Sequence, residues 1–177
     1  MSSTDALRRG RRVHIRHPRA GDRDAFLAAV DRSRRLHRPW THPPADAEAF
    51  RSFVRGADTA TTQRFLVCAN RDGELVGVAN LSQIFHGPFR NAYLGYYAFA
   101  PHDGQGLTKE GLQLTIRHAF AALGLHRIQA NVQPENERSI GLLRSLGFSE
   151  EGYARRYLKI GGRWRDHVLF AVLADDR

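Results

Sequence analysis

Apolar residues recur along this chain with two different periods, and the changes of period divide it into strands and helices. Alternating or continuous apolar runs that end at glycine or proline are typical of strands, whereas apolar residues three and four positions apart are typical of helices. The predicted strands are residues 12–17, 64–69, 75–84, 92–100, 126–132, 148–160 and 164–172. The predicted helices are residues 22–36, 46–55, 104–123 and 135–146. This order predicts a mixed α/β fold around one sheet.

Turn-forming residues mark the limits of these elements. The segment 70–73 ends in glycine and separates two β-rich runs, which predicts a hairpin. Gly124 and Gly147 follow the two most regular helical stripes and are natural helix ends. Three prolines within residues 39–44 enclose Trp40 in a predicted loop.

The composition is that of an ordinary globular domain. Of 177 residues, 42% are hydrophobic and 25% charged, which supports a sizeable core and excludes a disordered tail or a disulfide-stapled miniature. No repeat or linker divides the chain, so we expect residues 1–177 to form one domain, with residues 1–10 as a disordered basic arm. The single cysteine, Cys68, lies in an apolar run where a free thiol packs as a small hydrophobe. Because there is no signal-like N-terminus and no stretch of about 18 apolar residues, we expect a soluble cytoplasmic protein.

Positive charge is concentrated in two parts of the sequence. The formal net charge is +9, and residues 1–40 hold eleven arginines against four acidic residues. A second basic cluster near the end, opposed there only by Asp166, consists of Arg155, Arg156, Lys159, Arg163 and Arg165. Such patches attract polyanions such as nucleic acid, although a solvated arginine-rich surface is an equal alternative.

A glycine-rich segment, residues 104–108 (Gly-Gln-Gly-Leu-Thr), lies where a strand gives way to a helix. Unpaired amides and the positive end of the helix dipole suit a phosphate at such a position, although a plain structural turn is the alternative. The segment matches neither the GxxxxGK[ST] nucleotide loop nor the GxGxxG dinucleotide motif.

Other constellations do not have the spacing that catalysis or metal binding requires. His14 and His17 fall on opposite faces of a strand, and no Cys/His pair has metal-ligand spacing, so we expect no metal. No GxSxG motif is present for Ser-His-Asp hydrolysis. The pair Asp166-His167 is interpreted as a hydrogen-bonded part of a strand or turn.

Several segments follow one another in an order typical of one enzyme superfamily. They read Tyr93-Leu94-Gly95-Tyr96, Gly104-Gln105-Gly106, His126-Arg127-Ile128-Gln129-Ala130-Asn131, Asn136-Glu137-Arg138-Ser139 and Leu146-Gly147-Phe148. In this order the chain resembles the GCN5-related N-acetyltransferases (GNAT), which use acetyl-coenzyme A. Residues 151–168, the Pro39-Trp40 loop and residues 77–82 resemble the branch that acetylates N-terminal alanines of ribosomal proteins. The resemblance implies the GNAT fold, a single mixed, mostly antiparallel sheet flanked by helices.

The resemblance also implies a site for acetyl-CoA or CoA. The pyrophosphate would rest on amides of the glycine turn, and the pantetheine arm would pair with the preceding strand. The implied cofactor-binding residues are Tyr97, Ala98, Phe99, Gly104, Gln105, Gly106, Leu107, Thr108 and Asn136. Pro101 and Asp103 stand where the family often has Gln or Arg and a basic residue, which predicts weaker cofactor binding.

The catalytic assignments depend on the same resemblance. Leu143 replaces the tyrosine that commonly protonates the leaving thiolate, so Ser139 is the candidate acid, with a helix-start role as the alternative; Asn136 also suits a helix cap. The acidic residue that follows Pro-Trp in the branch is absent, because Thr41 and His42 stand there. Candidates for deprotonating the acceptor are Glu110, His42, and Asn131 as a water-positioning group. The implied acceptor-binding residues are Trp40, Asn80 and Ser82.

We therefore expect an N-acetyltransferase that acts by direct transfer in a ternary complex, with the N-terminal α-amine of a ribosomal protein as acceptor. An α-amine, with a pKa of about 7.7–8, needs only a weak base. Two alternatives stay open: acetylation of a small amine such as an antibiotic, a polyamine or an aminoacyl compound, and a non-catalytic module that binds ribosomes or nucleic acid. We expect a monomer or homodimer that contacts the ribosome through its basic face, and no membrane association.

Overall fold

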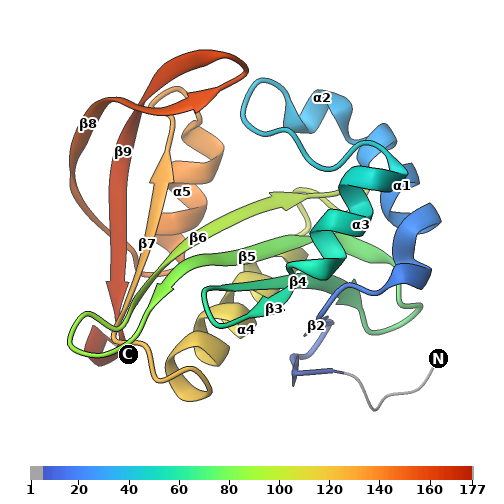
Figure 1. The fold of residues 1–177 in the computed structure, drawn as a ribbon, viewed down its shortest axis with the longest axis horizontal. Coiled ribbons are helices and arrows are strands. Elements are labelled where there is room, and N and C mark those ends of the chain that lie inside the picture. The colour runs from blue at the N-terminus through green and yellow to red at the C-terminus, as the bar shows by residue number, and fades with distance from the viewer. Residues whose placement is uncertain (1–5, 177) are drawn as a thin grey trace.

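The computed structural model describes residues 6–176, and these form one mixed, mostly antiparallel sheet with helices on both faces (Figure 1). The strands are β1 (Arg8–Arg9), β2 (Val13–Arg16), β3 (Asp58–Thr59), β4 (Thr62–Ala69), β5 (Leu75–Phe85), β6 (Asn91–Ala98), β7 (Arg127–Val132), β8 (Ser149–Ile160) and β9 (Arg163–Leu173). The helices are α1 (Arg23–Arg32), α2 (Arg34–His37), α3 (Ala47–Arg55), α4 (Leu107–Ala121) and α5 (Glu137–Ser145), with short 3-10 turns at Ala20–Asp22 and Ala174–Asp176. The strand order is β1-β2-β4-β5-β6-β7-β9-β8, and β3 pairs with β4. The predicted fold class is confirmed.

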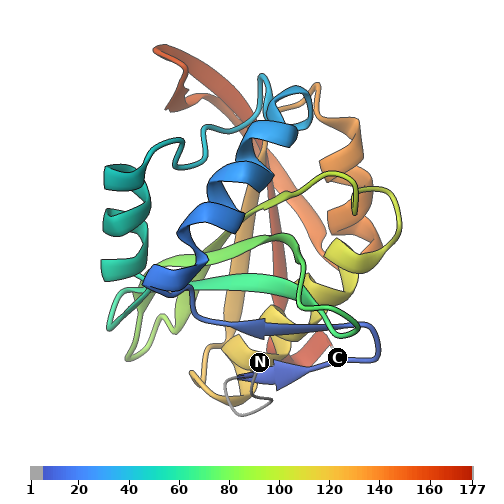
Figure 2. The same ribbon diagram turned by 90° about the vertical axis from the view of Figure 1, so that its right-hand side faces the viewer.

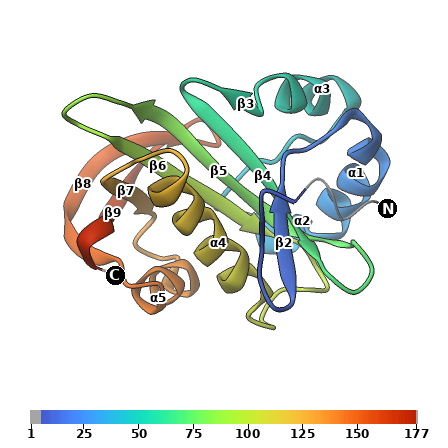
Figure 3. The ribbon, with the colours of Figure 1, turned by 90° about the horizontal axis from the view of Figure 1, so that it is seen from below.

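Two hydrophobic clusters hold the helices against opposite faces of the sheet (Figures 2 and 3). Strand β4 contributes to both, because its side chains alternate. Phe65 and Val67 pack in the cluster that includes α4, whereas Leu66 and Cys68 pack in the cluster that includes α1 and α3. This double burial explains why β4 reads as a continuous apolar run.

Strands β6 and β7 form a parallel pair that separates soon after it begins. Residues Asn91, Ala92 and Tyr93 pair with Arg127, Ile128 and Gln129. Beyond these pairs β6 continues to Ala98 and β7 to Val132, and Figure 1 shows the two strands diverging. The sheet is therefore split between its β1–β6 half and its β7–β9 half.

Two predicted helices differ from the observed ones, and side-chain and backbone chemistry explains both. The helix predicted over 22–36 divides at Ser33, whose hydroxyl donates to the Ala29 carbonyl (2.6 Å) and accepts from the Ala100 amide (2.9 Å). The helix predicted from residue 104 begins at Leu107, because Gly104 and Gly106 take positive φ angles (77° and 75°) that form a turn.

The N-terminal segment is more ordered than a disordered arm over residues 1–10 would be. Arg8 and Arg9 form β1 and pair with Ile15 and His14 of β2. Residues 1–5 of the expected arm lie outside the described residues. No helix within residues 6–176 is long and apolar enough to span a membrane.

The cysteine behaves as the sequence predicts. Cys68 is free and 1% exposed. Burial raises the pKa of its thiol to about 11, so the side chain is a protonated part of the core.

Glycine at position 111 sets how closely α4 approaches the sheet, and this gives a stability prediction. A Cβ built on Gly111 would lie 2.5 Å and 2.7 Å from the two methyl groups of Val67, whereas nothing lies within 4 Å of one built on Gly141 in α5. We expect Gly111→Ala to lower the free energy of unfolding by about 1–3 kcal/mol through overpacking. The matched control Gly141→Ala should raise it by about 0.5–1 kcal/mol through helix propensity. Denaturant unfolding of both variants measures these changes. An equal change in the free energy of unfolding of the two variants would show that α4 can move away from β4 to accommodate the added methyl group.

Candidate active site

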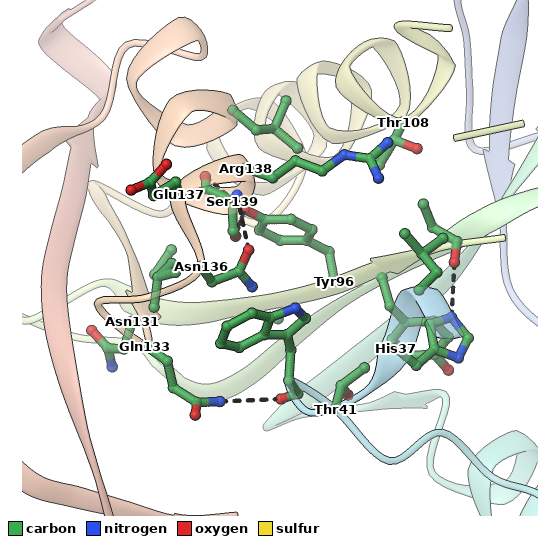
Figure 4. Close-up of a pocket in the computed structure, with 18 of the residues that line it drawn as sticks. His37, Thr41, Tyr96, Thr108, Asn131, Gln133, Asn136, Glu137, Arg138 and Ser139 are labelled. Carbon is green, nitrogen blue, oxygen red and sulfur yellow. Dashed lines mark hydrogen bonds between the residues drawn. The ribbon is translucent and has the colours of Figure 1, made fainter. Parts of the chain in front are cut away.

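A cavity of about 860 Å³ lies where β6 and β7 diverge. Its lining comes from β6, β7, the glycine turn before α4, the start of α5, the loop after α2 and the β8–β9 hairpin. The polar side chains labelled in Figure 4 line this cavity, and they include His37 of α2 and Thr108 of α4. The split in the sheet is thus the origin of the cavity.

The cavity reaches both faces of the sheet. Ala130 and Val132 of β7 pack in the cluster with α4 and α5, so strand alternation turns Asn131 and Gln133 toward the face of α1–α3. Asn136 and Ser139 at the start of α5 line the other side. Two ligands can therefore approach one point from opposite faces.

The glycine turn has the features of an anion site. Gly106 precedes α4 in the left-handed conformation, and no side chain of the described residues caps the first amides of the helix. A Cβ on Gly106 would lie 3.3 Å from Nη2 of Arg12, and one on Gly104 would lie 3.7 Å from Nη2 of Arg138. Arg12 also donates from Nη1 to the Gln105 carbonyl (3.1 Å). Unpaired amides, missing side chains and two guanidinium groups together fit a diphosphate.

The unexpected acid beside this turn has a cationic partner. Oδ2 of Asp103 lies 3.2 Å from Nη2 of Arg138. This ion pair offsets the negative charge that Asp103 would otherwise place beside an anion. The Gln105 side chain, meanwhile, donates to the Pro101 carbonyl (2.8 Å) and holds the turn closed.

A hydroxyl pair joins α5 to β6 inside the cavity (Figure 4). Oγ of Ser139 lies 2.5 Å from Oη of Tyr96, and the Asn136 side chain accepts from the Ser139 amide (3.2 Å). Burial raises the pKa of Tyr96 to about 12, although its hydrogen bond with Ser139 acts in the opposite direction. Tyr96 is therefore a neutral phenol at physiological pH. Sequence reasoning assigned it no role, and the only signal was its place in the Gly95-Tyr96 motif.

The opposite side of the cavity holds several polar contacts. The Gln133 side chain donates to the Trp40 carbonyl, and the Asn131 side chain donates to the Tyr157 hydroxyl, both at 3.5 Å. Nε2 of His37 lies 2.8 Å from the Ala98 carbonyl, so this nitrogen carries the hydrogen. Trp40 and Asn131 are thus brought to the same cavity as Ser139.

Most of the expected site residues gather at this cavity, and some do not. Lining residues from the expected set are Trp40, Tyr97, Ala98, Gly104, Gly106, Thr108, Asn131, Asn136 and Ser139. Expected residues that do not line it are His42, Asn80, Ser82, Phe99, Gln105, Leu107 and Glu110. The Phe99 amide donates to the Val76 carbonyl (2.8 Å) and is therefore used within the sheet. Asn80 and Ser82 lie on β5, opposite Gly95 and Tyr93 of β6.

Glu110 has a structural partner outside the cavity. Its carboxylate accepts from the Arg12 amide (2.7 Å) and from Nε of Arg12 (3.0 Å). Burial disfavours the charged form, but these hydrogen bonds outweigh it and lower the pKa of Glu110. The group is therefore placed to anchor Arg12, and it does not face the cavity.

Comparisons with known proteins agree with this geometry. The family model described as an acetyltransferase (GNAT) domain matches residues 12–149. The [ribosomal protein uS5]-alanine N-acetyltransferase of Escherichia coli (strain K12) is 48% identical over 103 residues, which are 58% of this chain and about half (53%) of that protein. The solved structure of Mycobacterium smegmatis RimJ in complex with CoA-disulfide has a TM-score of 0.85 and 31% identity, covering 93% of this chain and 83% of that one. The spermidine N(1)-acetyltransferase of E. coli K12 is 27% identical over 149 residues, 83% of this chain and 78% of that protein.

The hydroxyl pair gives a prediction with an adjacent control. We expect Tyr96→Phe to lower the free energy of unfolding by about 0.5–1.5 kcal/mol, because it removes one buried hydrogen bond. Tyr97→Phe should cause no loss, since the Tyr97 hydroxyl is buried without a hydrogen-bond partner among the described residues.

The burial of Tyr96 predicts that stability also depends on pH. Because folding raises the pKa of Tyr96 from 10.0 to about 12, its contribution to stability is complete below pH 10 and is lost as the pH rises toward 12. Denaturant unfolding between pH 8 and about pH 11 measures both effects. A Tyr96→Phe variant as stable as the parent would show that the contact with Ser139 contributes nothing.

Proposed function

This chain belongs to the GNAT acetyltransferase family, and from that premise we propose that it transfers the acetyl group of acetyl-CoA to the N-terminal α-amine of a ribosomal protein. The observation that carries the proposal is the cavity through the split sheet. An anion-binding turn opens on one side of it, and Trp40 and Asn131 lie on the other. The geometry therefore supports a donor and an acceptor that meet in one ternary complex.

The residues on the donor side fit coenzyme A. The first amides of α4 and the guanidinium groups of Arg12 and Arg138 would hold its diphosphate. The backbone N–H and C=O groups of alternate residues in a strand point toward opposite neighbouring strands, so those of Tyr96 and Ala98 point away from β5 and into the gap beside β6. They would pair with the pantetheine arm. The Ala98 carbonyl keeps a second lone pair beside its bond with His37. When bound, acetyl-CoA supplies the acetyl group as an activated thioester.

Ser139 and Tyr96 are suited to assist departure of the thiolate. Ser139 Oγ would donate to the sulfur as negative charge develops there, while the Tyr96 phenol donates to Ser139 across their 2.5 Å contact. The raised pKa of Tyr96 keeps its proton available at neutral pH. This pair would take the place of the single tyrosine that Leu143 replaces.

Charge favours a protein N-terminus over a polyamine as acceptor. The five cations of the β8–β9 hairpin named in the sequence analysis are all exposed on the hairpin whose Leu158, Ile160 and His167 line the cavity. The cavity is also lined by the carboxylates Glu135 and Glu137. The five cations would repel spermidine, which is a polycation, and would attract the polyanionic surface of a ribosome. The spermidine-acetylating relative makes polyamine acetylation the second candidate.

The donor site predicts a selective loss of cofactor affinity. Gly106→Glu places a side chain and a negative charge where the diphosphate is expected, so CoA affinity should fall at least tenfold, on the order of 1.4 kcal/mol or more. Gly124→Glu is the matched control, because Gly124 also has a positive φ (64°) but lies beyond the other end of α4, where nothing stands within 4 Å of an added Cβ. Titration calorimetry with CoA compares the two variants with the parent. Equal affinity in all three proteins would move the diphosphate away from this turn.

The acceptor proposal is tested by a competition of substrates. Release of free CoA is measured with a peptide that begins with Ala, with the same peptide blocked at its α-amine but carrying a lysine, and with spermidine. We expect the highest kcat/KM for the free Ala peptide, because an α-amine loses its proton near neutral pH more readily than a lysine amine. A preference for spermidine would replace the proposed acceptor with the second candidate, and no transfer to any amine would favour a non-catalytic binding module.

A further inference from the structure

His167 lies on β9 and lines the cavity, although it is only 2% exposed. Its Nδ1 is 3.0 Å from the Arg165 carbonyl oxygen. A carbonyl oxygen can only accept, so Nδ1 carries a hydrogen, and in the neutral imidazole Nε2 then keeps its lone pair. The contact therefore fixes the tautomer of the neutral side chain and leaves Nε2 as its one acceptor nitrogen.

Strand alternation places His167 on the acceptor side of the cavity. Val168 and Phe170 pack in the cluster with α4 and α5, so His167 faces the side of α1–α3. On that face its ring lies 5.9 Å from the ring of Tyr157, whose hydroxyl accepts from Asn131. His167 thus stands beside the residues that an acceptor amine would meet.

A bulge in the β8–β9 hairpin fixes this arrangement. Ala154 pairs with His167 and Leu158 with Arg165, so three residues of β8 face the single residue Asp166. The Asp166 carboxylate accepts from the Arg156 amide and from the Tyr153 hydroxyl, both at 2.7 Å. Arg156 has a positive φ (48°), which a non-glycine residue rarely adopts without such support. Bulges commonly redirect side chains next to active sites, and this one turns Tyr157 toward Asn131.

We propose that His167 is the general base of this enzyme and removes a proton from the acceptor ammonium through Nε2. The inference rests on the proposed function. The proton moves to Nε2, the freed nitrogen lone pair attacks the acetyl carbonyl carbon, and the C–S bond breaks as the C–N bond forms. Ser139 donates a proton to the departing thiolate, and the extra proton still carried by the new amide nitrogen restores the Ser139 hydroxyl through water. The imidazolium then releases its proton to water, so the products are the amide, the CoA thiol and one proton.

Glu110, His42 and His37 are less well placed to act as the base. Glu110 and His42 do not line the cavity. Nε2 of His37 is occupied by the Ala98 carbonyl. His167 is the cavity histidine among residues 6–176 whose Nε2 has no hydrogen-bond partner in the structure.

The surroundings of His167 keep it unprotonated at neutral pH. Burial lowers its pKa below 6.5, although the Arg165 carbonyl and the carboxylates of Asp166 and Glu135 act in the opposite direction. The ring of Tyr157 faces it from β8. A base that is free at pH 7 suits an α-amine with a pKa of about 7.7–8.

The kinetic test compares His167→Gln with the parent on the Ala peptide across about pH 6.5–9. We expect turnover to fall on the order of 10²–10⁴ at pH 7, and the deficit to shrink toward pH 9, where the amine is already neutral. His118→Gln is the matched control, because His118 is also buried and bonds Gln63 away from the cavity. CoA affinity, measured by calorimetry, should match the parent in both variants. Unchanged turnover, or a deficit that is the same at every pH, would overturn the proposal.

A second measurement needs no turnover. Nitrogen-15 NMR of the histidine rings in the free protein should show His167 as the neutral Nδ1–H tautomer at pH 7, with its resonance assigned by its loss in His167→Gln. An Nε2–H tautomer or an imidazolium would overturn the base assignment even if acetyl transfer is observed. If the parent transfers acetyl only to spermidine, the α-amine acceptor is wrong, and a loss of that activity at pH 7 in His167→Gln would still support the base. If the parent transfers acetyl to no amine, both proposals fail.

Discussion

Beyond Tyr93 and Gln129, β6 and β7 no longer pair, so backbone N–H and C=O groups on the facing edges of both strands are left without a strand partner. The rest of the site depends on this separation. A sheet that stayed paired to Ala98 would be closed and would separate the layer of α4 and α5 from the layer of α1–α3. Because it opens, Ser139 from one layer and His167 from the strand surface of the other reach one cavity. The helices and the two hydrophobic clusters hold the halves of the sheet at this separation.

Arg12 connects the N-terminal hairpin to the proposed donor site. Its guanidinium bonds both the Gln105 carbonyl and the Glu110 carboxylate, so it is fixed from two sides beside the glycine turn. On the other side of the turn, Arg138 offsets Asp103. The positive charge needed for a diphosphate is thus supplied by residues that are distant in sequence from the glycine turn. The single nearby acid, Asp103, therefore does not make the turn unfavourable for an anion.

The fold could be predicted from the sequence because the spacing of apolar residues and the positions of turn-forming residues indicate the same elements along most of the chain. In α4, for example, apolar residues recur at helical spacing from Leu112 to Ala119, and the helix ends before Gly124. The resemblance also led to most residues of the proposed donor side that line the cavity. The division of the first helix could not be predicted, because it depends on Ser33 meeting the Ala100 amide across 67 positions. The role proposed for His167 could not be predicted for a similar reason. The bulge opposite Asp166 breaks the two-residue alternation, and the tautomer depends on a backbone carbonyl that no sequence pattern reveals.

The protonated, enclosed thiol of Cys68 has a practical consequence for the study of this protein. CoA released by acetyl transfer carries a free, solvent-accessible thiol, whereas the one cysteine of the folded chain is shielded from solvent and from ionisation. A disulfide dye that changes colour when it reacts with a thiol would therefore detect the released CoA, with little background signal from the enzyme. In the absence of substrates the same dye would react only when the core opens, so its slow colour change would record the opening rate of the native state.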